Sequence, residues 1–220
     1  MTYDPHKHHR RSIRLKGYDY TQAGAYFVTF VAHDRECLFG EVVDGVMWLN
    51  AFGEIVRDEW FRTAVVRPYV MLDPDEFVVM PNHVHGIIWI VGAGDRGHGD
   101  DGGDVDVFVG AQRRCAPTPP TPPTPPTPHT VRRPVGGATP TNVVPGSLGA
   151  IVRAIKSATT KRINALRGTP AAPVWQRNYY ERIIRYETSL NRIRRYIAAN
   201  PSQWAEDHEH PRHPLRRRAT

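Results

Sequence analysis

The chain has 220 residues, a formal net charge of +7 and a sequence pI near 9.7, and it contains 20 prolines and 18 glycines. This length allows one domain, or two small ones, with a buried core. No apolar run approaches the roughly 18 residues that a membrane span needs, and two cysteines exclude a disulfide framework and a cysteine-built zinc site. The N-terminus lacks the apolar stretch of a secretory signal, so we expect a cytoplasmic protein without a membrane partner.

The hydrophobic pattern predicts interleaved strands and helices. In chain order we expect a strand over residues 26–32, a hairpin of 38–43 and 46–49, a helix ending near 66, strands over 69–80 and 84–91, a helix over 147–166, a strand near 180–184 and a last helix over 187–199. Asp44-Gly45 favours the two-residue hairpin turn, and Asn50 and Ser147 are placed to cap helices. An α+β sandwich with a mainly antiparallel sheet fits this order best.

Proline and glycine are concentrated in residues 92–146, which hold 11 of the 20 prolines and 10 of the 18 glycines. Such a composition buries too little apolar surface to fold, so it predicts a disordered insert with polyproline II character. We therefore expect a basic N-terminal arm over residues 1–16, a single domain over 17–204 that the insert interrupts, and a basic C-terminal tail over 205–220.

Two histidines carry the clearest chemical signal. His83 and His85 are two residues apart at the start of a predicted strand, and alternate side chains of a strand project from the same face. Two imidazole groups on one face can hold a divalent metal ion in a cleft. The pattern also fits two ordinary polar residues whose hydrogen bonds are satisfied at a strand start.

The last predicted helix supplies a second pair. Tyr196 and Asn200 are four residues apart, so they are neighbours on one face at the edge of an apolar stripe. Their phenol and amide oxygens can bind a hard metal ion. Tyr196 could equally be an aromatic residue at the edge of the core, and Asn200 a cap at the helix end. Because Pro201 follows, we expect the backbone to leave the helix at Asn200.

Charge is unevenly distributed along the chain. Residues 147–220 carry fifteen basic and five acidic side chains, whereas residues 17–91 carry four and eleven. This favours a polyanionic partner, most simply nucleic acid, along the last two helices and the N-terminal arm. Residues 175–180 mix aromatic side chains with arginine and amides, which suits stacking on unpaired bases but also an ordinary amphipathic strand. The expected DNA-binding residues are Arg153, Lys156, Lys161, Trp175, Gln176, Arg177, Arg192 and Arg195.

Several segments, in this order, resemble the REP-associated tyrosine transposases, a branch of the bacterial single-tyrosine, His-hydrophobic-His transposases. The matching segments are residues 14–20 with 26–30, 35–40, 80–85 (Met-Pro-Asn-His-Val-His), 174–185 and 190–201. The resemblance covers about residues 10–91 and 145–204, and the insert is where the chain departs from it. It implies a ferredoxin-like sandwich with a mainly antiparallel central sheet and helices on one face.

The resemblance also implies site residues. By position, His83, His85 and Asn200 would bind Mg²⁺ or Mn²⁺, and Tyr196 would be the nucleophile that cuts single-stranded DNA near hairpins through a 5′-phosphotyrosine intermediate. Arginines beside Tyr196 could favour its phenolate form. Three other tyrosines compete for this role but have no amide side chain four residues later: Tyr179, Tyr180 and Tyr186. A homodimer is a further expectation from the family.

Two other functions stay open at this point. One is a non-catalytic, domesticated protein or regulator that only binds hairpin DNA, whose binding would not depend on His83 or Tyr196. The other is a replication-initiation or plasmid-mobilisation nickase with the same chemistry, although those usually belong to longer chains with helicase regions.

Overall fold

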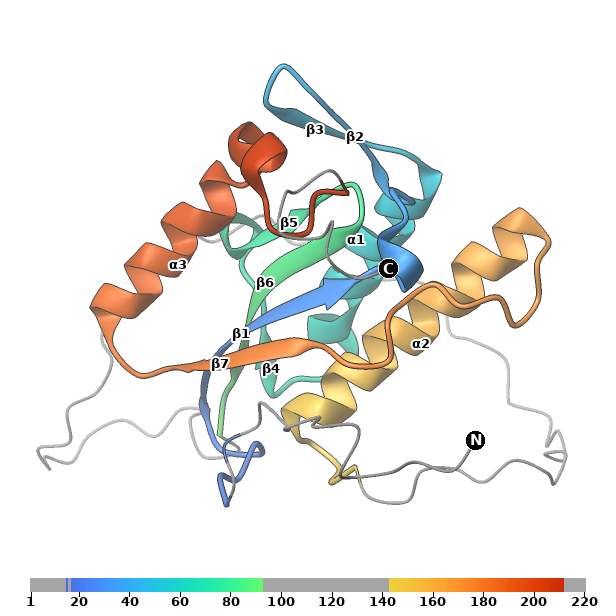
Figure 1. The fold of residues 1–220 in the computed structure, drawn as a ribbon. Helices are drawn as coiled ribbons and strands as arrows, with labels where there is room; N and C mark the ends of the chain where they lie inside the picture. Colours follow the sequence, from blue (N-terminus) through green and yellow to red (C-terminus); the bar gives the residue numbers. More distant parts are fainter. Residues whose placement is uncertain (1–14, 16, 93–142, 212–220) are drawn as a thin grey trace, which may run out of the picture. The chain divides into compact units, whose positions relative to one another are not determined.

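A computed structural model describes residues 15, 17–92 and 143–211, which belong to one compact unit built around an antiparallel sheet (Figure 1). The strands are β1 (Gly24–Val31), β2 (Gly40–Val43), β3 (Val46–Leu49), β4 (Val70–Met71), β5 (Phe77–Val79), β6 (His83–Ile90) and β7 (Tyr180–Ile184). The helices are α1 (Ala51–Val66), α2 (Leu148–Arg167) and α3 (Glu187–Ala199), with 3₁₀ turns at His33–Arg35, Pro74–Glu76 and Pro201–Glu206. Most of the predicted insert and of the predicted N-terminal arm lies outside the described residues. None of the described helices combines the length and the apolar character that a membrane span requires.

β1 and β6 form the centre of the sheet. Their antiparallel ladder pairs Gly24 with Ile90 at one end and Val31 with His83 at the other. β7 pairs with the other side of β1, and β4 and β5 pair with the other side of β6, all antiparallel. The order β1, α1, β4 with β5, β6, α2, β7 is the β-α-β-β-α-β ferredoxin-like arrangement. The predicted α+β class with an antiparallel sheet is therefore confirmed.

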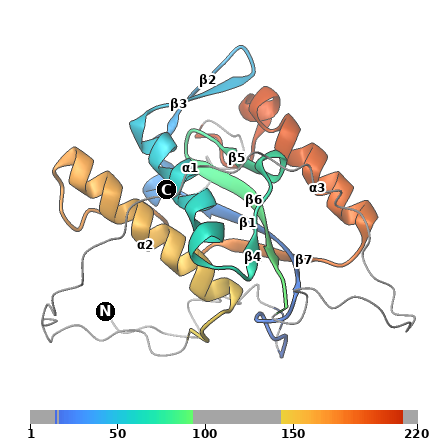
Figure 2. The same ribbon diagram turned by 180° about the vertical axis from the view of Figure 1, so that it is seen from behind.

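Different helices cover the two faces of this sheet (Figures 1 and 2). Tyr26 and Phe30 of β1 pack into the core that α1 and α2 complete. Phe27, which points the other way, packs in a second cluster with Ile193 of α3. The expectation that the helices lie on one face is thus corrected for α3: both faces of β1 are apolar, and each needs a cover.

The predicted caps and hairpin turn are present. Asn50 Oδ1 accepts hydrogen bonds from two backbone N–H groups in the first turn of α1, at 2.9 and 3.1 Å. Ser147 Oγ accepts one at the start of α2, at 3.3 Å. The β2–β3 turn has φ values of 51° at Asp44 and 73° at Gly45, as this two-residue turn requires. Short-range chemistry therefore sets where these elements begin.

The strand expected over residues 69–80 is divided into β4 and β5. Asp73 Oδ1 accepts a hydrogen bond of 2.9 Å from the Asp75 N–H, and Pro74 occupies the first position of the 3₁₀ turn between the strands. Because proline has no N–H to donate and Asp73 caps the turn, the ladder cannot continue through this segment.

The same turn places Glu76 where it ties α3 to the sheet. The buried Glu76 carboxylate accepts hydrogen bonds from Arg194 Nε at 2.7 Å and from Trp89 Nε1 at 2.6 Å. Arg194 belongs to α3 and Trp89 to β6, so one side chain links the helix to the central strand. Arg194 is two residues before Tyr196, and this ion pair therefore fixes the part of α3 that carries the predicted nucleophile.

Replacing Glu76 with alanine is expected to lower the free energy of unfolding by about 2 to 3 kcal/mol, because Trp89 Nε1 and Arg194 lose their shared acceptor. Chemical denaturation of the full chain measures the loss. Glu54→Ala is the matched control, since Glu54 also pairs with an arginine, Arg57, but in a half-exposed pair worth less than about 1 kcal/mol. Equal losses in the two variants would contradict this role of Glu76.

Candidate functional site

His83 and His85 lie at the start of β6, on the sheet face that α3 covers. Their side chains are buried, with 0% and 4% of each residue exposed, and their Nε2 atoms are 2.9 Å apart. The His85 ring also stacks on Phe27, with 5.6 Å between ring centroids and an interplanar angle of 22°. The prediction that both imidazole groups project to one side is confirmed.

Neighbouring side chains orient the two imidazole rings. Asn82 Nδ2 donates hydrogen bonds to two backbone carbonyl groups, at 3.1 and 2.8 Å, so its Oδ1 is left to accept one from His83 Nδ1 at 2.8 Å. His83 Nδ1 is therefore the donor in this contact, and its Nε2 faces His85 Nε2. His85 Nδ1 lies 2.8 Å from Thr29 Oγ1, an outer contact of the kind that orients metal-binding histidines.

Tyr196 reaches the same point from α3. Its hydroxyl oxygen is 3.1 Å from His85 Nε2, and the two rings lie 5.0 Å apart at an angle of 64°. Tyr196 is 42% exposed, so its hydroxyl group sits at the boundary between the buried histidines and solvent. The structure thus brings together the predicted nucleophile and the predicted metal ligands.

The surroundings of Tyr196 favour its neutral form. Burial raises the pKa of Tyr196 above its usual value, the Asp207 and Glu209 carboxylates add to the rise, and a hydrogen bond with Asn200 acts in the opposite direction. The expectation that nearby arginines favour the phenolate is corrected for Arg194, whose guanidinium group pairs with a glutamate instead. A nucleophilic role for Tyr196 would therefore require that its hydroxyl group be activated.

Asn200 lies one turn after Tyr196 and is 2% exposed. Its backbone keeps helical angles, φ −58° and ψ −43°, and runs directly into the 3₁₀ turn of Pro201–Glu206. As expected, α3 ends at Ala199, but the chain does not turn away, because Pro201 begins a 3₁₀ turn, where its missing N–H costs nothing. Asn200 Oδ1 is buried and has no hydrogen-bond partner among the described residues, which costs free energy that a bound cation could offset.

Asp207 is a site residue that the sequence did not reveal. Its Oδ2 lies 4.0 Å from His83 Nε2, and its side chain is 7% exposed. One potential ligand atom each from His83, His85 and Asp207 fall within 4.8 Å of one another. Asp207 belongs to the residues that we assigned to a basic tail, and no periodicity or motif in that segment marks an isolated aspartate.

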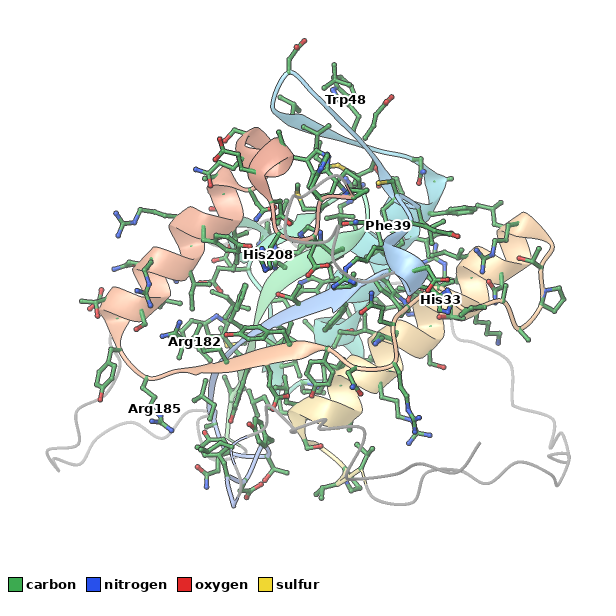
Figure 3. All side chains as sticks on the ribbon, viewed as in Figure 1. His33, Phe39, Trp48, Arg182, Arg185 and His208 are labelled. Atoms are coloured by element: carbon green, nitrogen blue, oxygen red, sulfur yellow. The ribbon has the colours of Figure 1, made fainter. Side chains whose placement is uncertain are left out.

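The segment that carries Asp207 is held against the site. Glu209 Oε2 pairs with Arg35 Nε at 2.7 Å, and the Glu209 carbonyl accepts the 2.8 Å hydrogen bond from Asn82. Trp204 lies against His83 with 5.9 Å between ring centroids. His208, in the same segment, lies over the sheet beside α3 (Figure 3). These contacts join residues just after α3 to the strand that bears the histidines.

The residues present fit a divalent metal ion. Two imidazole nitrogens face each other, a carboxylate lies beside them, and a buried amide oxygen one turn from Tyr196 lacks a partner among the described residues. Burial lowers the pKa of His85 well below its usual value, and the nearby His83 acts in the same direction, so the ring is neutral and able to bind metal. The Asp207 oxygen makes the set more suitable for Mg²⁺ or Mn²⁺ than imidazole and amide groups alone.

The predicted DNA-binding residues are divided between the two faces of the sheet. Arg192 and Arg195 are exposed on α3, beside Tyr196. Arg153 and Lys161 are exposed on α2, which covers the opposite face. A groove of about 710 Å³ along α2 and the following loop is lined by Lys156, Lys161, Gln176 and Arg177 among others, but by none of the site residues. Arg153 and Lys161 therefore do not share a face with Tyr196, whereas Gln176 also lines a groove beside Tyr196.

Two of these residues have structural roles. Lys156 Nζ donates hydrogen bonds to the carbonyl groups of Gln176 at 2.5 Å and Asn178 at 3.1 Å, and burial lowers the pKa of Lys156 to about 8. Trp175 is 7% exposed, and its Nε1 donates a hydrogen bond of 2.8 Å to Thr159 Oγ1. The expectation that Trp175 stacks on DNA bases is thus corrected, because its ring is part of the core.

Comparison with known proteins gives one close relative. No family model matches the chain. An uncharacterized protein of Haemophilus influenzae is 36% identical over 200 residues, which cover 91% of this chain and 92% of that protein. A REP-associated tyrosine transposase bound to a REP hairpin has a TM-score of 0.49 and 16% identity, and the match covers 87% of this chain and 74% of that chain. A candidate transposase from Deinococcus radiodurans has a TM-score of 0.35 and 17% identity, and the match covers 85% of this chain and 96% of that chain. At these values, the two solved structures do not bear on the function of this chain.

Mn²⁺ at about a hundred times its dissociation constant is expected to stabilise the chain by about 2.7 kcal/mol, because it binds the folded state alone. His83→Ala should abolish the Mn²⁺-dependent rise in melting temperature. The matched control is His33→Ala, since His33 also has a carboxylate neighbour, Asp34 at 3.2 Å, but its side chain is 41% exposed. A rise of the same size in His83→Ala and wild type would exclude a metal site at these histidines.

Asp207→Asn is expected to weaken Mn²⁺ binding about tenfold or more, because the site loses its negatively charged oxygen. Calorimetric titration of the full chain gives the dissociation constant. Asn200→Ala, measured alongside, tests the ligand that the family resemblance implies, and Asp34→Asn serves as an exposed control. An unchanged dissociation constant in Asp207→Asn would remove Asp207 from the ligand set.

Proposed function

The chain belongs to one family with the uncharacterized Haemophilus influenzae protein, and we propose that it is a metal-dependent transposase or nickase for single-stranded DNA near hairpins. One observation carries the proposal: the Tyr196 hydroxyl oxygen lies 3.1 Å from His85 Nε2, which in turn lies 2.9 Å from His83 Nε2. The histidines come from β6 and the tyrosine from α3, at the positions that resemble the metal and nucleophile motifs of the REP-associated tyrosine transposases.

Tyr196 is the proposed nucleophile. Attack of its oxygen on a phosphodiester forms a bond from tyrosine oxygen to phosphorus and breaks the bond from phosphorus to the 3′ oxygen, which leaves as a hydroxyl group. The DNA on the 3′ side of the cut stays on the protein through its 5′ phosphate. Because one phosphodiester replaces another, a free 3′-hydroxyl group can reverse the step, and no external energy source is needed.

The chain's own groups prepare this attack. Tyr196 begins as a neutral phenol because burial raises its pKa, and its hydrogen bond with Asn200 favours the phenolate. His83, His85 and Asp207, with Asn200, would hold the metal ion. When bound, such an ion supplies Lewis-acid chemistry, which makes an anionic phosphodiester a better electrophile.

The partner that we propose is single-stranded DNA with hairpins. Tyr196 is 42% exposed, so a strand can reach its hydroxyl group. Arg192 and Arg195 are exposed on the same helix, where they can contact phosphates without entering the site. A homodimer belongs to the same proposal, and light scattering of the purified chain tests it.

Covalent capture tests the activity. With Mg²⁺ or Mn²⁺, a pool of 3′-labelled single-stranded hairpins with varied flanks should give a labelled protein band that survives denaturing electrophoresis. The 5′-labelled strands should instead release a shorter fragment with a 3′-hydroxyl end. We expect Tyr196→Phe to lose the adduct by about a thousandfold or more, as removal of a nucleophile does, and Tyr186→Phe, an exposed tyrosine at the start of α3, to keep it.

The outcomes separate the proposal from its alternatives. Equal adduct in wild type and Tyr196→Phe would exclude this tyrosine as the nucleophile. Hairpin binding without any adduct, unaffected by His83→Ala, would identify a non-catalytic DNA-binding protein instead.

A further inference from the structure

We infer that the groove beside Tyr196 is a subsite for one unpaired nucleobase, and that Tyr180 stacks on the base of the nucleotide next to the cleaved phosphate. This inference deepens the proposed function and rests on it. The groove, called here the Tyr180 groove, has a volume of about 420 Å³, within the range of small-molecule sites. It is lined by Phe27, Thr29, Val31, His85, Gln176, Asn178, Tyr179, Tyr180, Tyr196, Asp207, His208 and Glu209.

Strand register places Tyr180 beside the catalytic centre. Thr29 of β1 pairs with His85 on one side and with Tyr180 on the other, so the three residues form one row across β6, β1 and β7. Residues directly opposite each other in a ladder share a face, and Tyr180 therefore points to the same side as His85. Two strand spacings separate them, roughly 10 Å.

The ring contacts continue this row to the nucleophile. Phe27 has Tyr180 on one of its sides and Tyr196 on another, each with 6.2 Å between ring centroids and interplanar angles of 69° and 83°. A base on Tyr180 therefore lies one aromatic ring away from the attacking tyrosine. We accordingly assign it to a nucleotide that flanks the cut rather than to a distant hairpin.

The chemistry of the lining favours a base over a phosphate. None of the described residues that line the groove is lysine or arginine, while Asp207 and Glu209 contribute carboxylates. An anionic phosphate is poorly accommodated by such walls without a cation. A flat, neutral base suits the aromatic side of the groove, and the Gln176 and Asn178 side chains offer amide donors and acceptors of the type that read base edges.

Tyr180 is also available for stacking. It is 45% exposed on the outer strand of the sheet. Its contact with Phe27 is edge-to-face rather than stacked. Trp175, which the sequence predicts to stack on bases, is buried in the core. Within residues 175–180 we therefore assign base stacking to Tyr180.

Fluorescence of 2-aminopurine tests the subsite without cleavage. Single-stranded hairpins that carry the probe at successive flank positions are titrated with the full chain in EDTA. We expect quenching at one flank position, and Tyr180→Ala should reduce both the quenching and the affinity, the affinity by about 5- to 100-fold. Tyr180→Trp should restore both, because it keeps a stacking face, and Tyr186→Ala should change neither, because Tyr186 is 69% exposed but outside the groove.

Unchanged quenching and affinity in Tyr180→Ala, or equal losses in Tyr186→Ala, would overturn the subsite. If the wild type forms the covalent adduct while Tyr180→Ala binds and cuts equally well at subsaturating DNA, the subsite fails and the proposed function stands. If the probe is quenched through Tyr180 but no adduct forms with any metal, the proposed function fails and base binding stands.

Discussion

The ladder between β1 and β6 is the constraint on which the rest of the structure depends. It places His83 and His85 at the start of β6, one of the two central strands, opposite Val31 and Thr29. A shift of register by one residue would turn both histidines into the core under α1 and α2. Because apolar side chains fill both faces of this pair, and α3 closes the face with the histidines, the packing that stabilises the sheet also specifies the geometry of the site.

Burying two imidazole rings, an amide and a carboxylate together is costly unless hydrogen bonds compensate. Here hydrogen bonds to neighbouring side chains compensate the outer nitrogen of each imidazole ring. The outward nitrogens are satisfied, His83 by Asn82 and His85 by Thr29. On the inner side the two Nε2 atoms face each other at 2.9 Å, and the buried Asn200 Oδ1 has no hydrogen-bond partner among the described residues. A preorganised metal centre has this distribution, since its outer contacts hold ligands in place before the ion arrives.

Net charge describes the surface of this chain better than its site. Among the described residues, exposed basic side chains lie on α2 and α3, whereas burial and, after it, the Asp207 and Glu209 carboxylates raise the pKa of Tyr196. Basic side chains on the helices can hold a strand by its phosphates, and the groove without lysine or arginine can select a base. Attraction and selection would thus be carried by different parts of the fold.

The sequence by itself determined the elements and half of the site. Caps at Asn50 and Ser147, the Asp-Gly turn, and the His-Val-His spacing act over a few residues, so local chemistry is enough to predict them. The strand expected over 69–80 is instead two short strands, because Asp73 and Pro74 form a turn between them. Only the tertiary structure decided that α3 takes the second face of the sheet, that Trp175 is core while Tyr180 faces the site, and that Asp207 joins the histidines. These outcomes depend on contacts such as that between Asn82 and Glu209, 127 residues apart, which no local pattern encodes.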